Sequence, residues 1–241
     1  MVAELDLCIQ IPGMVIPVTG ETEWAHGLWA LPSWMPSSAP TVVVAPHPDD
    51  ETLGVGGLIA ALRAGGVDVT IVAVTDGEHA YTENAGLAAL RCLEQTCALA
   101  RLGVPAEKIV RLRLVDSSLA RQENELVARL RPLITADTQV FAPWIGDFHP
   151  DHEACARAAA VAAADVGAKL ISYFFWTWHR GTLATVAGLE LRKFELSEES
   201  LTAKSEALTC HVSQLVHAPE PEILPNNLLW PARMPFEVFA L

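Results

Sequence analysis

Between residues 41 and 176 the chain alternates short apolar runs with longer segments in which apolar residues recur at helical spacing. The apolar runs predict strands at 41–45, 67–74, 109–114, 139–142 and 170–176. The segments between them predict helices at 52–64, 85–102, 123–133 and 151–166, and glycine follows the first two, as is common at helix ends. Apolar strands that alternate with helices are typical of a mostly parallel sheet covered by helices on both faces, so we expect an α/β fold.

The two ends of the chain have different patterns. After residue 176 we expect a strand at 189–196, a helix at 198–209 with Ser197 as its N-cap, and a last strand at 236–240. Residues 1–40 contain five prolines, which exclude a long helix, and three tryptophans, which favour packing against a core. We therefore expect residues 1–40 to form a strand-rich extension packed on a single domain of residues 41–241.

Composition and charge narrow the class of protein. The 241 residues are 51% hydrophobic, which is enough for a substantial core and excludes a disordered chain. Sixteen Lys and Arg against 29 Asp and Glu give a net charge of −13, and no basic cluster reverses it locally. The electrostatic field of this negative charge repels a phosphate backbone, so we expect no nucleic-acid partner. The pattern leaves the oligomeric state open.

Cysteine usage and hydropathy predict a cytoplasmic protein without a membrane partner. The five cysteines form no CxxC pair, which favours reduced thiols. The apolar run 154–166 contains Arg157 and Asp165 and is too short to cross a bilayer. Glu4 and Asp6 stand where a signal peptide would carry basic residues.

Two charged clusters follow predicted strands. His47-Pro48-Asp49-Asp50-Glu51 comes directly after strand 41–45, and His149-Pro150-Asp151-His152-Glu153 comes after strand 139–142. Ligands of open α/β sheets bind at the carboxyl ends of the strands. Burying this much negative charge without a partner would cost several kcal/mol per ion, so a cation is expected there. Two histidines and one carboxylate suit a catalytic zinc, which keeps one position open for water.

Other interpretations of these motifs are weaker. A single His-Pro-Asp is usually a turn, but two of them at strand ends favour one shared site. Gly54-Val55-Gly56-Gly57 is similar to a dinucleotide-binding loop, yet Ile59 stands at the third glycine position. We expect these glycines to allow close packing of a helix on the sheet. Adjacent Asp49 and Asp50 cannot point the same way, so one can bind a metal while the other faces the bound water.

These stretches also resemble a known family. Residues 44–52, Val-Ala-Pro-His-Pro-Asp-Asp-Glu-Thr, resemble the signature of the LmbE-like (PIG-L) zinc deacetylases, and 148–152 resemble its second motif. Residues 74–78 and 91–94 match two intermediate motifs. The resemblance implies a three-layer, Rossmann-like α/β domain. It also implies hydrolysis of the N-acetyl group of an N-acetylglucosamine-type sugar, or of its conjugate, by a zinc-activated water.

The resemblance assigns a role to each motif position. It implies one Zn²⁺ per chain, with Fe²⁺ as an alternative metal, held by His47, Asp50 and His152. It implies that Asp49 is the general base and that His149 is a cationic partner that stabilises the oxyanion and protonates the leaving amine. It further implies that Asp151 orients the His149 ring, and that Arg91 and Asp116 bind sugar hydroxyls or an attached phosphate.

One position departs from the family pattern. Some members carry a tyrosine two residues before the second motif, where this chain has Asp147. We expect Asp147 to orient a site histidine or to bind a substrate hydroxyl. Two alternatives to the amino-sugar deacetylase stay open: a zinc amidase acting on a non-sugar amide, such as a thiol conjugate or an antibiotic, and a sugar- or metal-binding relative without turnover.

Overall fold

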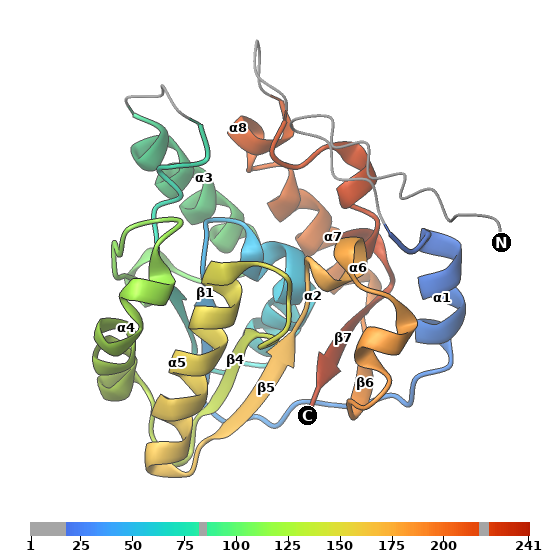
Figure 1. The fold of residues 1–241 in the computed structure, drawn as a ribbon, viewed down its shortest axis with the longest axis horizontal. Helices are drawn as coiled ribbons and strands as arrows, with labels where there is room; N and C mark the ends of the chain where they lie inside the picture. The colour runs from blue at the N-terminus through green and yellow to red at the C-terminus, as the bar shows by residue number, and fades with distance from the viewer. Residues whose placement is uncertain (1–17, 82–85, 217–221) are drawn as a thin grey trace, which may run out of the picture.

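One mixed sheet with seven strands organises the protein, in the order β3-β2-β1-β4-β5-β7-β6 (Figure 1). The computed structural model describes residues 18–81, 86–216 and 222–241. The strands are β1 Thr41–Ala45, β2 Val69–Ala73, β3 Ile109–Arg111, β4 Gln139–Pro143, β5 Lys169–Tyr173, β6 Leu191–Glu195 and β7 Phe236–Ala240. The helices are α1 Glu21–Trp29, α2 Asp50–Ala64, α3 Leu87–Arg101, α4 Glu123–Leu130, α5 Pro150–Val166, α6 Thr177–Arg180, α7 Glu198–Leu208 and α8 Val212–Leu215. The predicted α/β fold is confirmed, and its strands agree with the expected runs apart from their ends.

Six of the seven strands run in the same direction, and only β7 is reversed. Strand β1 pairs in parallel with both β2 and β4, with Val43 opposite Ile71 on one side and Phe141 on the other. Strand β7 is antiparallel to both β5 and β6. Because β1 and β4 are parallel neighbours, their carboxyl ends lie side by side. They lie at the same end of the sheet as the carboxyl end of β5 (Figure 1).

Alternate side chains of the strands build two cores, one on each face of the sheet. Val43 and Ile71 pack with residues of α2, α3 and α7 on one face. Val42 and Val44 pack with α4 and α5 on the other, where α5 contributes small alanines that let it lie close to the sheet. The result is the expected three-layer arrangement, with helices on both faces (Figure 1).

The described part of the N-terminal extension is helical where strands were expected. Residues 1–17, which include Cys8, lie outside the described residues. For residues 18–40 the prediction of strand-rich structure is wrong. Helix α1 occupies a proline-free stretch, with Glu21 and Glu23 in its first turn, where acidic side chains favour the helix dipole. Its Trp24 is fully buried against Trp178, with ring centroids 5.0 Å apart.

Helix α2 packs unusually closely, and its glycines explain how. A Cβ at Gly54 would collide with the Tyr173 ring of β5, and one at Gly57 would collide with Leu196. The prediction that these glycines allow close helix packing is confirmed.

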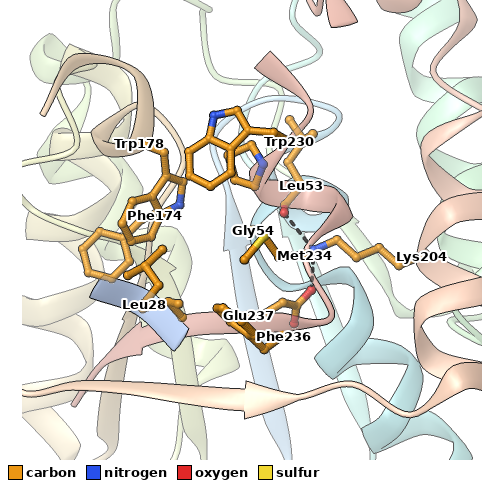
Figure 2. Close-up of a pocket in the computed structure, with 12 residues that line it drawn as sticks. Leu28, Leu53, Gly54, Phe174, Trp178, Lys204, Trp230, Met234, Phe236 and Glu237 are labelled. Atoms are coloured by element: carbon orange, nitrogen blue, oxygen red, sulfur yellow. Dashed lines mark hydrogen bonds and ion pairs between the residues drawn. The ribbon is translucent and has the colours of Figure 1, made fainter. Parts of the chain in front are cut away.

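A buried ion pair meets α2 beside these glycines (Figure 2). Lys204 of α7 lies 2.6 Å from Glu237 of β7 and also donates to the carbonyl oxygen of Leu53 at 3.0 Å. Glu237 accepts the backbone N–H groups of Gly57 and Leu58. In a regular helix Gly57 N–H donates to the carbonyl oxygen of Leu53. Here Gly57 N–H also has an acceptor outside α2, Glu237, and the Leu53 carbonyl also has a donor outside α2, Lys204.

Candidate active site

The two charged clusters meet at the carboxyl ends of β1 and β4. The first cluster leads from β1 into α2, which begins at Asp50. The second leads from β4 into α5, which begins at Pro150. His149 is the N-cap of α5, where its Nδ1 accepts a hydrogen bond from Asp151 N–H at 3.2 Å. Parallel pairing of β1 and β4 therefore brings together residues about 100 positions apart.

His47, Asp50 and His152 converge as a metal-ligand set. One nitrogen or oxygen from each lies within 4.8 Å of the others. The Asp50 carboxylate lies between the two rings, with Oδ2 3.1 Å from His47 Nδ1 and Oδ1 3.3 Å from His152 Nε2. Asp50 and His152 are both buried. Two imidazole nitrogens and one carboxylate oxygen fit a tetrahedral zinc that keeps one position open.

His152 has the environment of a metal-bound histidine. Its Nδ1 lies 2.8 Å from Asp147 Oδ2, so the hydrogen on Nδ1 leaves the Nε2 lone pair free. Within the described residues, this buried Nε2 has no hydrogen-bond partner. A histidine that binds a metal through one ring nitrogen usually donates a hydrogen bond from the other to a carboxylate, which fixes the orientation of the ring. The donor set therefore fits a bound divalent cation.

Asp147 supports the site from behind the pocket. It is completely buried, and its oxygens accept the backbone N–H groups of Phe175, Trp176 and Thr177 as well as the Thr177 hydroxyl. Of the two roles expected for Asp147, this arrangement fits the orientation of His152 and leaves no oxygen for a substrate hydroxyl.

Carboxylates surround His47 on both sides of its ring. Its Nε2 lies 3.3 Å from Asp116 Oδ1 and 3.4 Å from Asp151 Oδ2. Burial lowers the pKa of His47, but hydrogen bonds to Asp116, Asp151 and Asp50 outweigh burial and raise that pKa well above its ordinary value. The carboxylates around His47 therefore stabilise positive charge at this position, which favours a bound cation.

Asp49 is a buried carboxyl beside the ligand set. Burial and the neighbouring Asp50 raise the pKa of Asp49 to about 6, against the opposing effects of Arg91, His47 and His152. The Arg91 guanidinium of α3 lies close by, with its Nη2 3.9 Å from Asp49 Oδ2. A carboxylate with a pKa close to neutrality is well suited to accept and return a proton.

Arg91 is a buried structural cation of α3. Its guanidinium donates to the carbonyl of Gly77 at 2.9 Å and to Gln214 Oε1 at 2.8 Å. Gly77 has φ +66°, and a Cβ there would collide with this guanidinium, so glycine is required. Gln214 Nε2 also donates to the carbonyl of Pro48 at 2.6 Å, which ties α8 to the first motif.

His149 lies over the pocket with its ring stacked on Trp176, at a centroid distance of 6.0 Å and an interplanar angle of 19°. Burial, and then the positive charges of His152 and His47, lower the pKa of His149 to about 3. The ring is therefore neutral at pH 7 and carries its hydrogen on Nε2, because Nδ1 accepts from Asp151 N–H. The neutral ring can donate one hydrogen bond through Nε2, and the cationic role implied by the family resemblance stays a prediction.

The Asp151 carboxylate lies near the His149 ring, with ligand atoms of the two residues within 4.8 Å, and it also has backbone partners. It accepts Ser117 N–H at 2.7 Å and Leu119 N–H at 3.0 Å. The hydrogen bond of Asp151 to the His149 ring comes from its backbone N–H. Asp151 therefore fixes the loop after β3 against the start of α5, and its backbone orients His149.

A pocket of about 190 Å³ opens on this cluster and has two kinds of wall. Six of the nine residues expected in the site line it: His47, Asp49, Asp50, Arg91, Asp116 and His149. The apolar part of the lining includes Phe175, Trp176, Ile223 and Leu224. The other three, Asp147, Asp151 and His152, lie behind it, each at most 1% exposed.

Sequence reasoning missed several residues that hold the site. Gln95 donates to the buried Glu51, whose pKa burial raises to about 8. Gln95 lies four positions after Arg91, and this helical spacing would have placed it on the same face of α3. Gln214 has no local signal, because 123 positions separate it from Arg91.

Comparisons with known proteins agree with this geometry. The family model described as PIG-L, GlcNAc-PI de-N-acetylase, matches residues 42–163. A 1D-myo-inositol 2-acetamido-2-deoxy-alpha-D-glucopyranoside deacetylase of Corynebacterium glutamicum is 30% identical, over 74% of this chain and 76% of its own. The N,N'-diacetylchitobiose deacetylase of Pyrococcus horikoshii superposes with a TM-score of 0.57 at 26% identity, over 74% of this chain and 71% of its own.

A further solved structure supports the fold alone. The teicoplanin deacetylase Orf2 superposes with a TM-score of 0.67 at 18% identity, over 83% of this chain and 97% of its own. In the described part of the chain, none of the helices is both long and apolar enough to cross a bilayer. With half of its length matched by the family model and a relative 30% identical over about three quarters of both chains, the chain belongs to the PIG-L (GlcNAc-PI de-N-acetylase) family.

Proposed function

We propose that this protein removes the acetyl group from an N-acetylglucosamine-type amino sugar or its conjugate, using one divalent metal ion, with zinc as the expected ion. The observation that carries the proposal is the convergence of His47, Asp50 and His152 beside Asp49, at the base of a pocket that His47, Asp49 and Asp50 line. Relatives named as deacetylases of inositol-linked N-acetylglucosamine and of diacetylchitobiose support the substrate class.

Each polar residue has a distinct part in this chemistry. When bound, the metal acts as a Lewis acid on the acyl oxygen and lowers the pKa of a water. The Asp49 carboxylate, buried beside the ligand set, accepts the proton of the attacking water and returns it to the leaving nitrogen. His149 donates its Nε2 hydrogen to the developing oxyanion.

The two walls of the pocket suit a sugar ring. The polar wall presents the Asp116 carboxylate, held by His79 N–H at 3.0 Å, to substrate hydroxyls. The apolar wall presents Trp176 to the less polar face of the ring. We propose a small-molecule substrate in the cytoplasm, since the described cysteines are free thiols and the net charge of −13 disfavours polyanionic partners.

Acetate release tests this function directly. Protein purified without chelator is assayed for metal content, and for acetate release from N-acetylglucosamine conjugates and from non-sugar N-acetyl amides. We expect about one divalent ion per chain and faster release from the sugars. Faster release from non-sugar amides would instead identify a general amidase. Sugar binding without acetate release at full metal occupancy would identify a binding protein.

A further inference from the structure

Two free thiols meet at the packed surface between α3 and the end of α7. Cys97 lies on α3 and is exposed, and Cys210 follows α7 by two residues and is partly exposed. Cys210 Sγ donates to Cys97 Sγ at a distance of 3.1 Å. The contact joins residues that are 113 positions apart in the sequence.

The backbone on both sides of this contact is anchored. Ala98, the residue after Cys97, is fully buried in the core beneath α2, α3 and α7. Ala207, three residues before Cys210, is fully buried in the same core, and Cys210 packs against that core. Helix α3 packs on α7 along this region. The two sulfurs are therefore held together by rigid elements.

The same two segments also hold the candidate active site. Directly after Cys210, the side chain of His211 lies 3.3 Å from the hydroxyl of Thr52 on α2. Ser213 donates its N–H and its hydroxyl to Glu94 of α3, each at 2.7 Å. Gln214 holds Arg91 of α3, as described above. A covalent link between α3 and the 208–215 segment would therefore secure a contact that the site already uses.

We propose that Cys97 and Cys210 are a modification site, at which a small disulfide oxidant forms a reversible cross-link that ties α3 to the segment carrying α8. The proposal rests on the thiol pair and its packing, and it is independent of the reaction that the enzyme catalyses.

The chemistry proceeds by two thiol–disulfide exchanges. The Cys97 thiolate attacks one sulfur of the oxidant, whose S–S bond breaks and releases one small thiol. The Cys210 thiolate then attacks the Cys97 sulfur and releases the second small thiol, which leaves the Cys97–Cys210 bond. The two protein thiols lose two electrons and two protons, and these convert the oxidant into two thiols.

The exposure of Cys97 and the partial burial of Cys210 set the order of the two steps. Cys97 is the more exposed thiol, so the oxidant reaches it first. Burial and the hydrogen bond to Cys97 raise the pKa of Cys210 to about 11, which keeps Cys210 protonated at the start. Formation of the mixed disulfide on Cys97 places its sulfur next to Cys210 Sγ, where the Cys210 thiolate can attack it.

The remaining described cysteines lack these features. Cys92 is partly buried and donates to Asp76 Oδ1 at 3.1 Å, and Cys155 is completely buried in α5. Burial raises the pKa of both thiols. They serve as internal controls, because a non-selective oxidant would modify them as well.

The test treats the metal-loaded full chain with oxidised glutathione and counts thiols after denaturation. We expect the count to fall from five to three, a Cys97–Cys210 cross-linked peptide by mass spectrometry, and full reversal by dithiothreitol. Closing so long a loop should raise Tm by roughly 5–10 °C. Five remaining thiols, or a cross-link to another cysteine, would overturn the proposal.

Two variants separate the steps. In Cys210→Ser the reaction should stop at one glutathione adduct on Cys97, without a rise in Tm. In Cys97→Ser the partly buried Cys210 should stay unmodified over the same period. A stable adduct on Cys97 in the unsubstituted protein would show that Cys210 cannot resolve it, which contradicts the proposed pair.

Discussion

Replacing Lys204 by methionine probes the buried ion pair that contacts the middle of α2. Lys204 and Glu237 have side chains that are 1% and 2% exposed, and their charged atoms lie 2.6 Å apart. Methionine retains an unbranched apolar stem but removes the ammonium group. The Glu237 carboxylate then keeps only the N–H groups of Gly57 and Leu58, and the carbonyl oxygen of Leu53 loses its donor from Lys204 (Figure 2).

Removing one partner of a buried ion pair costs about 3–5 kcal/mol, because the other charge stays buried without compensation. The two backbone hydrogen bonds to Glu237 persist, so we expect a loss of about 3–4 kcal/mol in the free energy of unfolding. For a chain of this size that corresponds to a fall in Tm of about 6–16 °C. Glu237→Gln should cost a similar amount, since it leaves the ammonium unpaired.

Urea unfolding of the two single variants and of the double variant measures the coupling. We expect the double variant to be more stable than the sum of the single losses by about 2 kcal/mol or more, because neither charge is then buried alone. The matched control is the exposed pair Arg129–Glu125, whose charged atoms lie 2.9 Å apart. Arg129→Met should change the free energy of unfolding by less than about 1 kcal/mol. Additive losses, or a Lys204→Met variant within about 1 kcal/mol of the parent, would refute the reasoning.

Three further predictions concern the site and its support. Asp49→Asn should lower kcat/KM by about 10²–10⁴-fold while metal content, measured by elemental analysis, stays unchanged, and equal loss of metal would mean that Asp49 is a ligand. Asp147→Asn should weaken metal affinity about 10–100-fold in competition with a chelator, because the amide no longer gives His152 Nδ1 a carboxylate partner, and unchanged affinity would contradict that role. Burial, and then the Arg91 guanidinium, lower the pKa of His211 to about 3. In the unfolded chain its pKa is about 6.5. Between about pH 3 and pH 6.5, therefore, the unfolded chain binds a proton on His211 that the native protein excludes. The stability contributed by His211 is complete above about pH 6.5 and falls by about 1.4 kcal/mol per pH unit below it. His211→Gln should therefore flatten the dependence of the urea midpoint on pH, and parallel curves would argue against a neutral buried His211.

The location of the site could be predicted from sequence because it depends on few assumptions. Apolar runs end at Ala45 and near Pro143, and a charged motif follows each end. Parallel strands place their carboxyl ends at one edge, so two such motifs meet whenever their strands are neighbours. Helix starts could be predicted for the same local reason, as at Ser197, whose hydroxyl accepts Ser200 N–H at 3.2 Å.

The roles within the site were less accessible, because they depend on which oxygen or nitrogen faces which partner. Asp147 was expected in the site, but only the structure shows that it accepts from His152 and from the backbone of residues 175–177. Arg91 matched a substrate-binding position, yet its guanidinium is held by Gly77 and Gln214. Such contacts join segments far apart in the chain and leave no local pattern.

By itself, the sequence determined the alternation of strands and helices, the two charged motifs and the ligand types that suit a metal, because each follows from local periodicity and residue chemistry. The tertiary structure alone decided the reversed direction of β7 between β5 and β6, the helix at Glu21–Trp29 and the meeting of Cys97 with Cys210. The physical reason is that these features depend on which surfaces pack together: Trp24 is buried by a helix against Trp178, and the thiols meet because α3 and α7 share one core.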